Sequence, residues 1–484
     1  MEKILKVGLI LSLLVSCLGV GLADNVLNIP LHAATLSLNP TGVQDRSALW
    51  VSRQINCQLV RFKGGASELE AAKSIQYIST DKIEVILNNK SHFQDGSPVT
   101  AEDVAASFDF LRQSRQVLLN IFSWIKNIEV VNNQELIFTL SKPTPEFLKV
   151  LASPNYSIFK KSFIEKAEQD SSLWKYPMGC GGYYVTQNTP GYIFIKPNNP
   201  DDIPVKFFLI ANNEINQSEV SNYSIIDMAV DGSPESLKGF QRIDIFDPSQ
   251  IYIGINATKQ PWQSLSARCS FLAHFDTQKV LQSYGNIAKP ANDFIPSGIL
   301  GYDPNATFIQ NIRNKYSKVV PPKLNKVCIA YLTVAIPEQY RSAFVAALKE
   351  QFPNVQINTI TNDQQFGITF ARSNCDFFAF DLKSNYLDAY EFILLFSEKY
   401  INFSGIYDDQ FAKQIEASQD IQDIQERVVD YRNIINKINN QCLILPVLTI
   451  PNERVFISNK LKTPGMGQGS INDYYLGHVR WINQ

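Results

Sequence analysis

The chain has 484 residues, of which 45% are hydrophobic and 11% aromatic, and its formal net charge is −2. This length suits two or three domains, and the hydrophobic content is that of an ordinary globular protein. The near-neutral charge, without a basic tract, argues against a nucleic acid partner. Only four histidines are present, which argues against a metal site built from side chains, and we expect no cofactor.

The N-terminus reads as an export signal. Two lysines in the first six residues precede an apolar run that is too short to span a membrane. This pattern predicts a signal peptide over residues 1–23, with cleavage after Ala23. A second processing site competes, because residues 14–17 (LVSC) resemble a lipobox that would make Cys17 a lipidated first residue. The apolar run continues beyond Cys17, so we favour cleavage near Ala23.

Six more cysteines are scattered along the chain without a C-x-x-C pair, which argues against zinc and thioredoxin-like sites. Export allows disulfides, but their connectivity stays open. Cys328 and Cys375 begin two predicted strands that could be neighbours, and they are either bonded or buried free thiols. The six residues are Cys57, Cys180, Cys269, Cys328, Cys375 and Cys442.

In chain order, the first predicted elements are a strand over residues 26–29 and a helix over residues 47–59. A strand follows at residues 83–87, where apolar residues alternate with others. Asp95-Gly96 then marks a turn in which glycine can take positive φ. Thr100 is a good N-cap for a helix to residue 113, with Asp103 in the capping-box position.

The stretch from 83 to 113, IEVILNNKSHFQDGSPVTAEDVAASFDFLRQ, resembles the signature of the family 5 extracellular solute-binding proteins, the peptide/nickel-binding partners of ABC importers. That signature reads F-x-D-G-[ST]-P-[LV]-T-A-E-D-V and continues into an S-[FL] helix. We expect the matching residues to hold the fold together and not to bind the ligand. They are Phe93, Asp95, Gly96, Pro98, Thr100, Ala101, Glu102, Asp103, Val104, Ser107 and Phe108.

The resemblance implies an α/β fold with two lobes, that of a type II (cluster C-like) periplasmic binding protein with mixed sheets and a hinge of crossing strands. The first lobe would comprise residues 24–246 and 445–484, with a small subdomain at about 60–175. The second lobe would comprise residues 247–444.

The middle of the chain fits this scheme. Residues 128–140 read as a hairpin, and PMGCGGY at 177–183 predicts a tight turn or close backbone approach; no Lys-Ser/Thr follows to make a phosphate-binding loop. Arg268 and Asp276 lie eight residues apart, so both could sit on one helix face and pair as helix-end charges. His274, on the same helix, is interpreted as a packed side chain that could act as a pH switch.

From residue 323 the pattern alternates between strands and helices. Strands at 327–334, 355–360 and 375–382 and a helix at 337–351 predict a parallel sheet, whose ligands bind beyond the carboxyl ends of the strands. A helix over 420–439 would present Ile421, Ile424, Val428, Tyr431, Ile435 and Ile438 as a core stripe. A strand at 442–449 would then return to the first lobe.

The resemblance also implies where the ligand binds. Relatives read ADYPDPxxFL where this chain has KSNYLDAYEF, and in peptide binders the first Asp of that motif grips the ligand α-amino group. Here the position is Asn385, and an uncharged amide cannot make that charge-assisted bond. The ligand amine would then be held only if Asp388 or Glu391 takes the role of the missing Asp. Asp388 could equally cap a helix. The expected ligand-binding residues are Thr41, Gly42, Asn256, Asn385, Tyr386, Asp388, Asn402 and Ser404.

The resemblance therefore implies a monomeric periplasmic receptor without enzymatic activity, which binds oligopeptides and delivers them to an ABC permease in the inner membrane. One alternative is the same fold with another solute, a sugar or a chelated metal, although the low histidine count argues against the metal. A secreted hydrolase has no H-E-x-x-H or G-x-S-x-G motif to support it. A structural envelope protein would need internal repeats, and none is visible.

Overall fold

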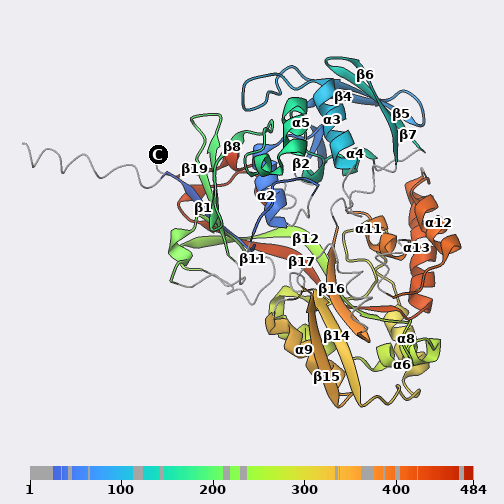
Figure 1. Ribbon diagram of the computed structural model, residues 1–484. Helices are drawn as coiled ribbons and strands as arrows, with labels where there is room; N and C mark the ends of the chain where they lie inside the picture. Colours follow the sequence, from blue (N-terminus) through green and yellow to red (C-terminus); the bar gives the residue numbers. More distant parts are fainter. Residues whose placement is uncertain are drawn as a thin grey trace, which may run out of the picture.

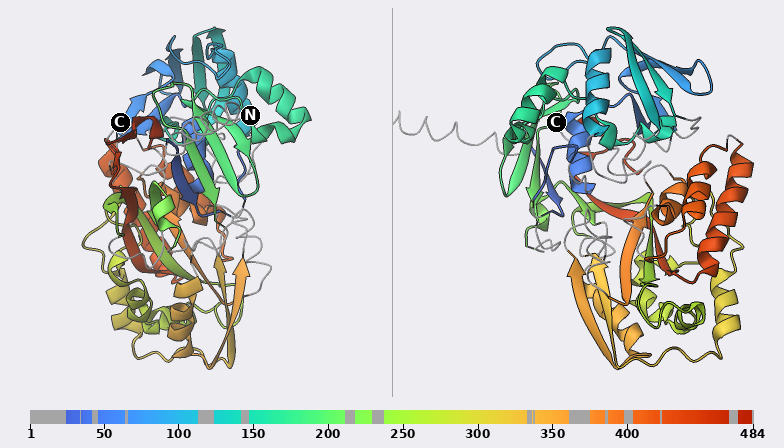
Figure 2. Two further views of the ribbon diagram at one scale, coloured as in Figure 1. Left: turned by 90° about the vertical axis from the view of Figure 1, so that its left-hand side faces the viewer. Right: turned by 45° about the vertical axis from the view of Figure 1, so that its right-hand side comes forward.

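The computed structural model describes residues 25–33, 35–41, 46–63, 66–112, 124–141, 147–210, 218–228, 237–332, 336, 338–360, 375–384, 387–397, 404–421, 423–467 and 474–482. Two lobes are joined by a pair of long antiparallel strands, β12 (Phe240–Ile255) and β17 (Ile444–Ser458). Figure 1 shows this pair running from the blue and green first lobe into the yellow and orange second lobe, and Figure 2 shows the same arrangement from two other sides.

The pairing of β12 with β17 changes register where the two lobes meet. Phe240 to Phe246 pair with Asn452 to Ser458, and a shift follows between Phe246 and Ser249. Each strand carries a proline at this shift, Pro248 in β12 and Pro451 in β17. Proline has no N–H to donate, so the ladder cannot run through these positions unbroken.

The first lobe contains a four-stranded sheet in the order β1-β10-β9-β8. Trp50, from a helix whose residues 47–55 are all buried, packs edge to face on Phe207 of this sheet, with ring centroids 5.9 Å apart. The elements are β1 (Leu27–Leu31), α2 (Arg46–Ile55), β8 (Tyr183–Asn188), β9 (Tyr192–Pro197) and β10 (Val205–Leu209).

A smaller unit of the first lobe is an antiparallel sheet in the order β4-β5-β7-β6. Ile83, Val85 and Leu87 are buried, so the alternation in the sequence marks its core face. Phe108 packs edge to face on Phe138. The elements are β4 (Ala72–Tyr77), β5 (Lys82–Leu87), α3 (Ala101–Arg112), β6 (Ile125–Asn132), β7 (Glu135–Leu140), α4 (Phe147–Val150) and α5 (Lys161–Gln169).

The second lobe extends the strand pair into a seven-stranded sheet in the order β11-β17-β12-β16-β14-β15, with β13 paired to β17. The predicted parallel arrangement is confirmed, since β14 runs parallel to β15 and β16. Phe271 stacks on Phe377 in its core, with ring centroids 4.3 Å apart. The first-lobe strand β11 (Ile225–Met228) joins this sheet through β17, and the second-lobe elements are α6 (Leu265–His274), α7 (Thr277–Ser283), β13 (Lys289–Pro290), α8 (Phe308–Tyr316), β14 (Lys326–Leu332), α9 (Glu338–Lys349), β15 (Asn354–Ile360) and β16 (Phe377–Lys383).

The other described elements include two longer helices beside this sheet and short pieces. They are β2 (Val60–Lys63), β3 (Ala66–Leu69), η2 (Pro154–Tyr156), η3 (Ser171–Lys175), η4 (Val220–Asn222), η5 (Gly285–Ile287), α11 (Tyr390–Ile393), η7 (Leu394–Phe396), α12 (Asp409–Ser418), α13 (Ile424–Asn440), β18 (Leu461–Lys462), η9 (Leu476–His478) and β19 (Arg480–Trp481).

The predicted turn and capped helix after β5 are confirmed. Gly96 has a φ of +83°, and its N–H donates to Phe93 O at 2.9 Å. The Thr100 hydroxyl donates to Asp103 Oδ2 at 2.6 Å and accepts from the Asp103 N–H at 3.3 Å. The shorter Asp therefore serves in place of the capping-box Glu.

Three predictions about helices are wrong. Helix α2 ends at Ile55 and not at residue 59, because Leu59 O accepts from Glu70 N and Ala72 N instead of continuing the helix. Helix α6 ends at His274, so Asp276 does not share its face with Arg268. Asp276 caps α7, and the Arg268 guanidinium donates to the backbone carbonyls of Trp262, Gln263 and Gln441.

The third error concerns the core stripe of α13. This helix begins at Ile424, whose side chain is half exposed, and Ile421 precedes it. Tyr431, Ile435 and Ile438 are buried as predicted, but the charged Arg427 is buried with them. Asp423 sets the start, since its carboxylate accepts from the N–H groups of Gln425 and Glu426.

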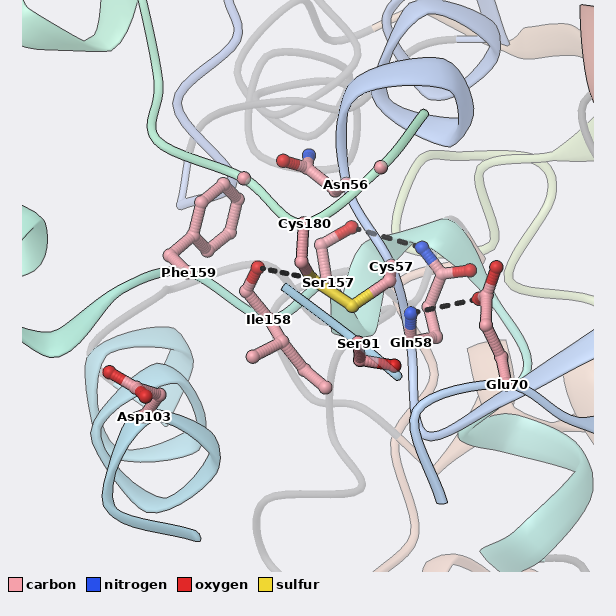
Figure 3. Close-up of a disulfide and its surroundings, with 12 residues drawn as sticks. Asn56, Cys57, Gln58, Glu70, Ser91, Asp103, Ser157, Ile158, Phe159 and Cys180 are labelled. Atoms are coloured by element: carbon pink, nitrogen blue, oxygen red, sulfur yellow. Dashed lines mark hydrogen bonds between the residues drawn. A yellow bond between two sulfur atoms is a disulfide. The ribbon is translucent and has the colours of Figure 1, made fainter. Parts of the chain in front are cut away.

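The six cysteines from Cys57 onward are paired, as Cys57–Cys180, Cys269–Cys442 and Cys328–Cys375. Figure 3 shows the first pair beside Gln58, which bonds to Glu70 and Ser157. A Cβ at Gly181 would lie 2.4 Å from Gln54 O, so the predicted close backbone approach is confirmed. Of the two alternatives for Cys328 and Cys375, the structure has the disulfide.

The Asp95 carboxyl should make the free energy of unfolding fall as the pH is lowered from about 4 to about 2. Hydrogen bonds from the Lys160 ammonium and from Ser97 hold its pKa at about 2, below the ordinary 3.8. A lowered folded-state pKa contributes stability above 3.8 that is lost as the pH falls through about 2. Because Asp95 is 37% exposed, we expect Asp95→Asn to remove less than about 1 kcal/mol. Urea unfolding between about pH 4 and pH 2 measures this loss, and Asp109→Asn should keep the wild-type slope.

Each disulfide should stabilise the folded protein by an amount that increases with the number of residues in the loop it closes. Cys269–Cys442 spans 173 residues and Cys328–Cys375 spans 47. In the chain-entropy account, replacing the first pair by serine should cost about 5 kcal/mol, roughly 1 kcal/mol more than the second. Urea unfolding of the two double variants without reductant measures both losses. An equal or reversed order would contradict the entropic account.

Candidate functional site

The buried apolar core is continuous from one lobe to the other. One cluster of buried side chains contains Phe147 and Leu151 of the small unit in the first lobe. The same cluster contains Phe392 and Phe396, from α11 and η7 beyond the strand pair. The two lobes are therefore in apolar contact as well as joined by strands.

Polar groups of the two lobes also approach each other here. Tyr156 of η2 is buried, and burial together with the carboxylate of Glu391 raises the pKa of its hydroxyl. The Ser384 hydroxyl donates to Glu391 Oε2. Glu391 belongs to α11, so the segment that resembles the amine-binding motif of relatives faces the first lobe near η2.

Asp388 is fully buried at the start of α11. Its Oδ1 accepts from Tyr390 N at 2.8 Å, and its own N–H donates to Ser384 Oγ at 3.2 Å. Leu300 bonds to the backbone on both sides of Asp388 and fixes the segment. Asp388 thus forms a side-chain turn just before α11, whose N-cap is Ala389 without a side-chain bond, and contact of Asp388 with a ligand stays a prediction. Asn385 and Tyr386 lie outside the described residues.

The structure brings Asn256 and Ser404 together. Ala257 N donates to Ser404 O at 2.9 Å, and both side chains are buried. Asn256 Nδ2 donates to Cys375 O, and its Oδ1 accepts from the Thr258 hydroxyl at 2.6 Å. The Asn256 amide therefore holds the chain where β12 ends.

Three further residues were predicted to contact the ligand, namely Thr41, Gly42 and Asn402. The Thr41 hydroxyl donates to Asn39 Oδ1 at 2.9 Å in a local turn. Gly42 and Asn402 fall outside the described residues. Whether these side chains meet a ligand stays a prediction.

Sequence reasoning missed a group of charges beside the strand pair. Arg46, at the start of α2, contacts Asp227 Oδ2 at 3.0 Å and Glu453 Oε1. The ring of His32 bonds through Nε2 to Asp227 O at 2.9 Å. The signal in the sequence was a lone glutamate, Glu453, in the long strand that runs through both lobes.

The comparisons with known proteins decide the family. The model for the middle region of the bacterial extracellular solute-binding proteins, family 5, matches residues 68–318. The chain belongs to this family.

Related proteins give this family 5 chain further context. It is 24% identical over 294 residues to the probable D,D-dipeptide-binding periplasmic protein DdpA of Escherichia coli, covering 56% of this chain and 57% of that protein. The chain matches only 29% to 57% of the length of such curated relatives. Among the described residues, no helix is long and apolar enough to cross a membrane, and no three His, Cys, Asp or Glu side chains are placed to hold a metal ion.

Solved structures confirm the two-lobed fold. The murein tripeptide binding protein MppA of Escherichia coli has a TM-score of 0.79 at 17% identity, with 96% of this chain and 100% of that chain covered. The binding protein MoaA of Agrobacterium tumefaciens R10, solved with mannopinic acid, has a TM-score of 0.80 at 16% identity, with coverages of 95% and 100%. The α/β periplasmic-binding-protein fold predicted from the sequence is therefore correct.

The contribution of the Asp388 bond to Tyr390 can be measured directly. Asp388→Ala leaves the N–H of Tyr390 without its acceptor, and we expect a loss of about 1 kcal/mol in the free energy of unfolding. The side-chain oxygen of asparagine can accept the same bond, so Asp388→Asn should lower the free energy of unfolding by about 0.3 kcal/mol at most. Urea unfolding of both variants measures the contribution of this bond. Equal losses would mean that the charge, and not the bond to Tyr390, is what the fold uses.

Proposed function

We propose that this family 5 protein is the solute-binding receptor of an ABC importer. The observation that carries the proposal is family membership over residues 68–318 together with two lobes joined through β12 and β17. In such an arrangement, a solute held by both lobes favours the closed form over the open one, and the closed form docks on the permease.

The proposed lobes are residues 24–246 with 445–484, and residues 247–444. The register shift next to Ser249 and the prolines on both strands support a hinge at this boundary. The proposed ligand contacts come from both lobes and from the crossing strands. They are Thr41, Gly42, Asn256, Asn385, Tyr386, Asp388, Asn402 and Ser404.

The proposed ligand is an oligopeptide, held largely through its backbone. The printed names of the similar DdpA and MppA, a D,D-dipeptide-binding and a murein tripeptide-binding protein, support this class. A second candidate is a non-peptide solute, because the similar structure of MoaA holds mannopinic acid. The protein would act as a monomer without enzymatic activity. It would be exported by residues 1–23 or anchored through a lipid on Cys17.

The proposal predicts binding without turnover. We expect the protein to retain short peptides at one per chain during equilibrium dialysis against a mixed tripeptide and tetrapeptide pool. Mass spectrometry of the pool before and after should show no cleavage product. Small-angle scattering should show a more compact particle when peptide is bound. Cleaved peptides would favour the hydrolase, and retention of sugar acids alone would favour the non-peptide solute.

A further inference from the structure

The strand register places two acidic side chains on one face of the sheet at the lobe junction. Asp227 of β11 lies opposite Val455 of β17, and Glu453 lies two residues before Val455. Side chains two apart on a strand share a face, so the two carboxylates are diagonal neighbours. Arg454 points to the other face, toward the exposed ion pair of Asp244 with Arg242.

Both carboxylates are buried, and one guanidinium serves both. Glu453 is 1% exposed and Asp227 is 6% exposed, and each contacts Arg46 through one oxygen. In the part of the chain that the structure describes, Asp227 Oδ1 and Glu453 Oε2 accept no hydrogen bond. A buried carboxylate oxygen without a donor is strongly unfavourable, and among the described residues the guanidinium of Arg46 is the cation that contacts both carboxylates.

A third acceptor adjoins the carboxylates. His32 follows β1 directly, and its Nε2 must donate to Asp227 O, because a carbonyl only accepts. In the neutral ring Nδ1 is then an acceptor, and it too is buried without a partner among the described residues. β1 and β11 run side by side in the same direction, since Asn28 meets Ser224 and His32 meets Asp227. The group therefore lies at the carboxyl ends of two strands, next to the strand pair that joins the lobes (Figure 1).

We propose that Asp227 and Glu453 bind the ammonium group of the solute, which in a peptide is the α-amino group. This inference rests on the proposed function and gives it an amine anchor in the first lobe, where Asn385 removes the carboxylate that relatives place in the second lobe. An ammonium has three N–H donors and accepts charge-assisted bonds from carboxylates. Arg46 is a positioning residue, because it contacts both carboxylates and orients their remaining oxygens.

An organic cation fits this group better than a metal ion. Metal–oxygen bonds of about 2.1 to 2.5 Å require ligands packed closely together, whereas N–H···O bonds of about 2.9 Å leave them farther apart. His32, Asp227 and Glu453 are not placed to hold one metal ion.

The test compares peptides with and without a free amine. The probe is a random tripeptide pool that lacks lysine, used as such or acetylated at the α-amino group, in equilibrium dialysis with the full chain. Wild type should retain the free-amine pool at least roughly tenfold more tightly than the acetylated pool. Glu453→Gln and Asp227→Asn should abolish this difference and keep the affinity for the acetylated pool. Asp244→Asn, a matched carboxylate change in the exposed ion pair of β12, should behave as wild type.

The outcomes separate this inference from the proposed function. Wild type that retains neither pool overturns the peptide ligand, and the amine anchor with it. Wild type that retains both pools equally, or a Glu453→Gln variant that still discriminates tenfold, overturns the amine anchor alone. An acetylated pool that contains lysine distinguishes a side-chain ammonium from the α-amino group. It should regain affinity only if the group accepts either ammonium.

A second measurement uses the wild-type protein alone and therefore tests the proposal even if the substituted proteins do not fold. A crystal structure of the wild-type protein with a free-amine tripeptide should place the ammonium nitrogen within about 3.2 Å of Asp227 Oδ1 or Glu453 Oε2. An ammonium bound elsewhere, with these two oxygens still unpartnered, would overturn the proposal without any substitution.

Discussion

The whole molecule depends on backbone hydrogen bonding between β12 and β17. These two strands are the elements that carry sheets on both sides: β11 joins β17 in the first lobe, and β16 joins β12 in the second. Register shifts between Phe246 and Ser249 and between Ile251 and Tyr252 interrupt the ladder, the first of them at the junction of the lobes. We propose that a rotation of one lobe against the other is absorbed near Pro248 and Pro451, because neither residue has an N–H to donate to the ladder. In the proposed receptor, the same strand pair would both connect the lobes and provide the hinge between them.

Local features of the fold could be predicted from the sequence because their causes are local. The Thr100–Asp103 cap, the turn at Gly96 and the alternation in β5 each depend on residues a few positions apart. The parallel arrangement of β14, β15 and β16 followed from the order of strands and helices. The helix ends were missed where distant partners decide them: Leu59 pairs with residues 70 and 72, and Arg268 bonds to the backbone of Gln441.

The candidate site was less predictable, because its members come together only in three dimensions. Arg46 and Glu453 lie about four hundred residues apart, and no periodicity links them. The family resemblance identified candidate ligand-binding positions, but it did not show whether each side chain contacts a ligand or supports the backbone. Asn256 and Asp388 both use their side chains to fix the backbone of a loop at a strand or helix end. A ligand-binding loop needs such internal support, so a motif position alone does not separate support from contact.

Each of the three disulfides joins two cysteines on the same side of the strand pair, within the first lobe or within the second. The cross-links constrain the chain within each proposed lobe, and none of the three joins one lobe to the other. This has a practical consequence for producing the protein. A chain synthesised in the reducing cytosol of a production host would lack its cross-links, and material for biophysical work should come from secretion into an oxidising compartment.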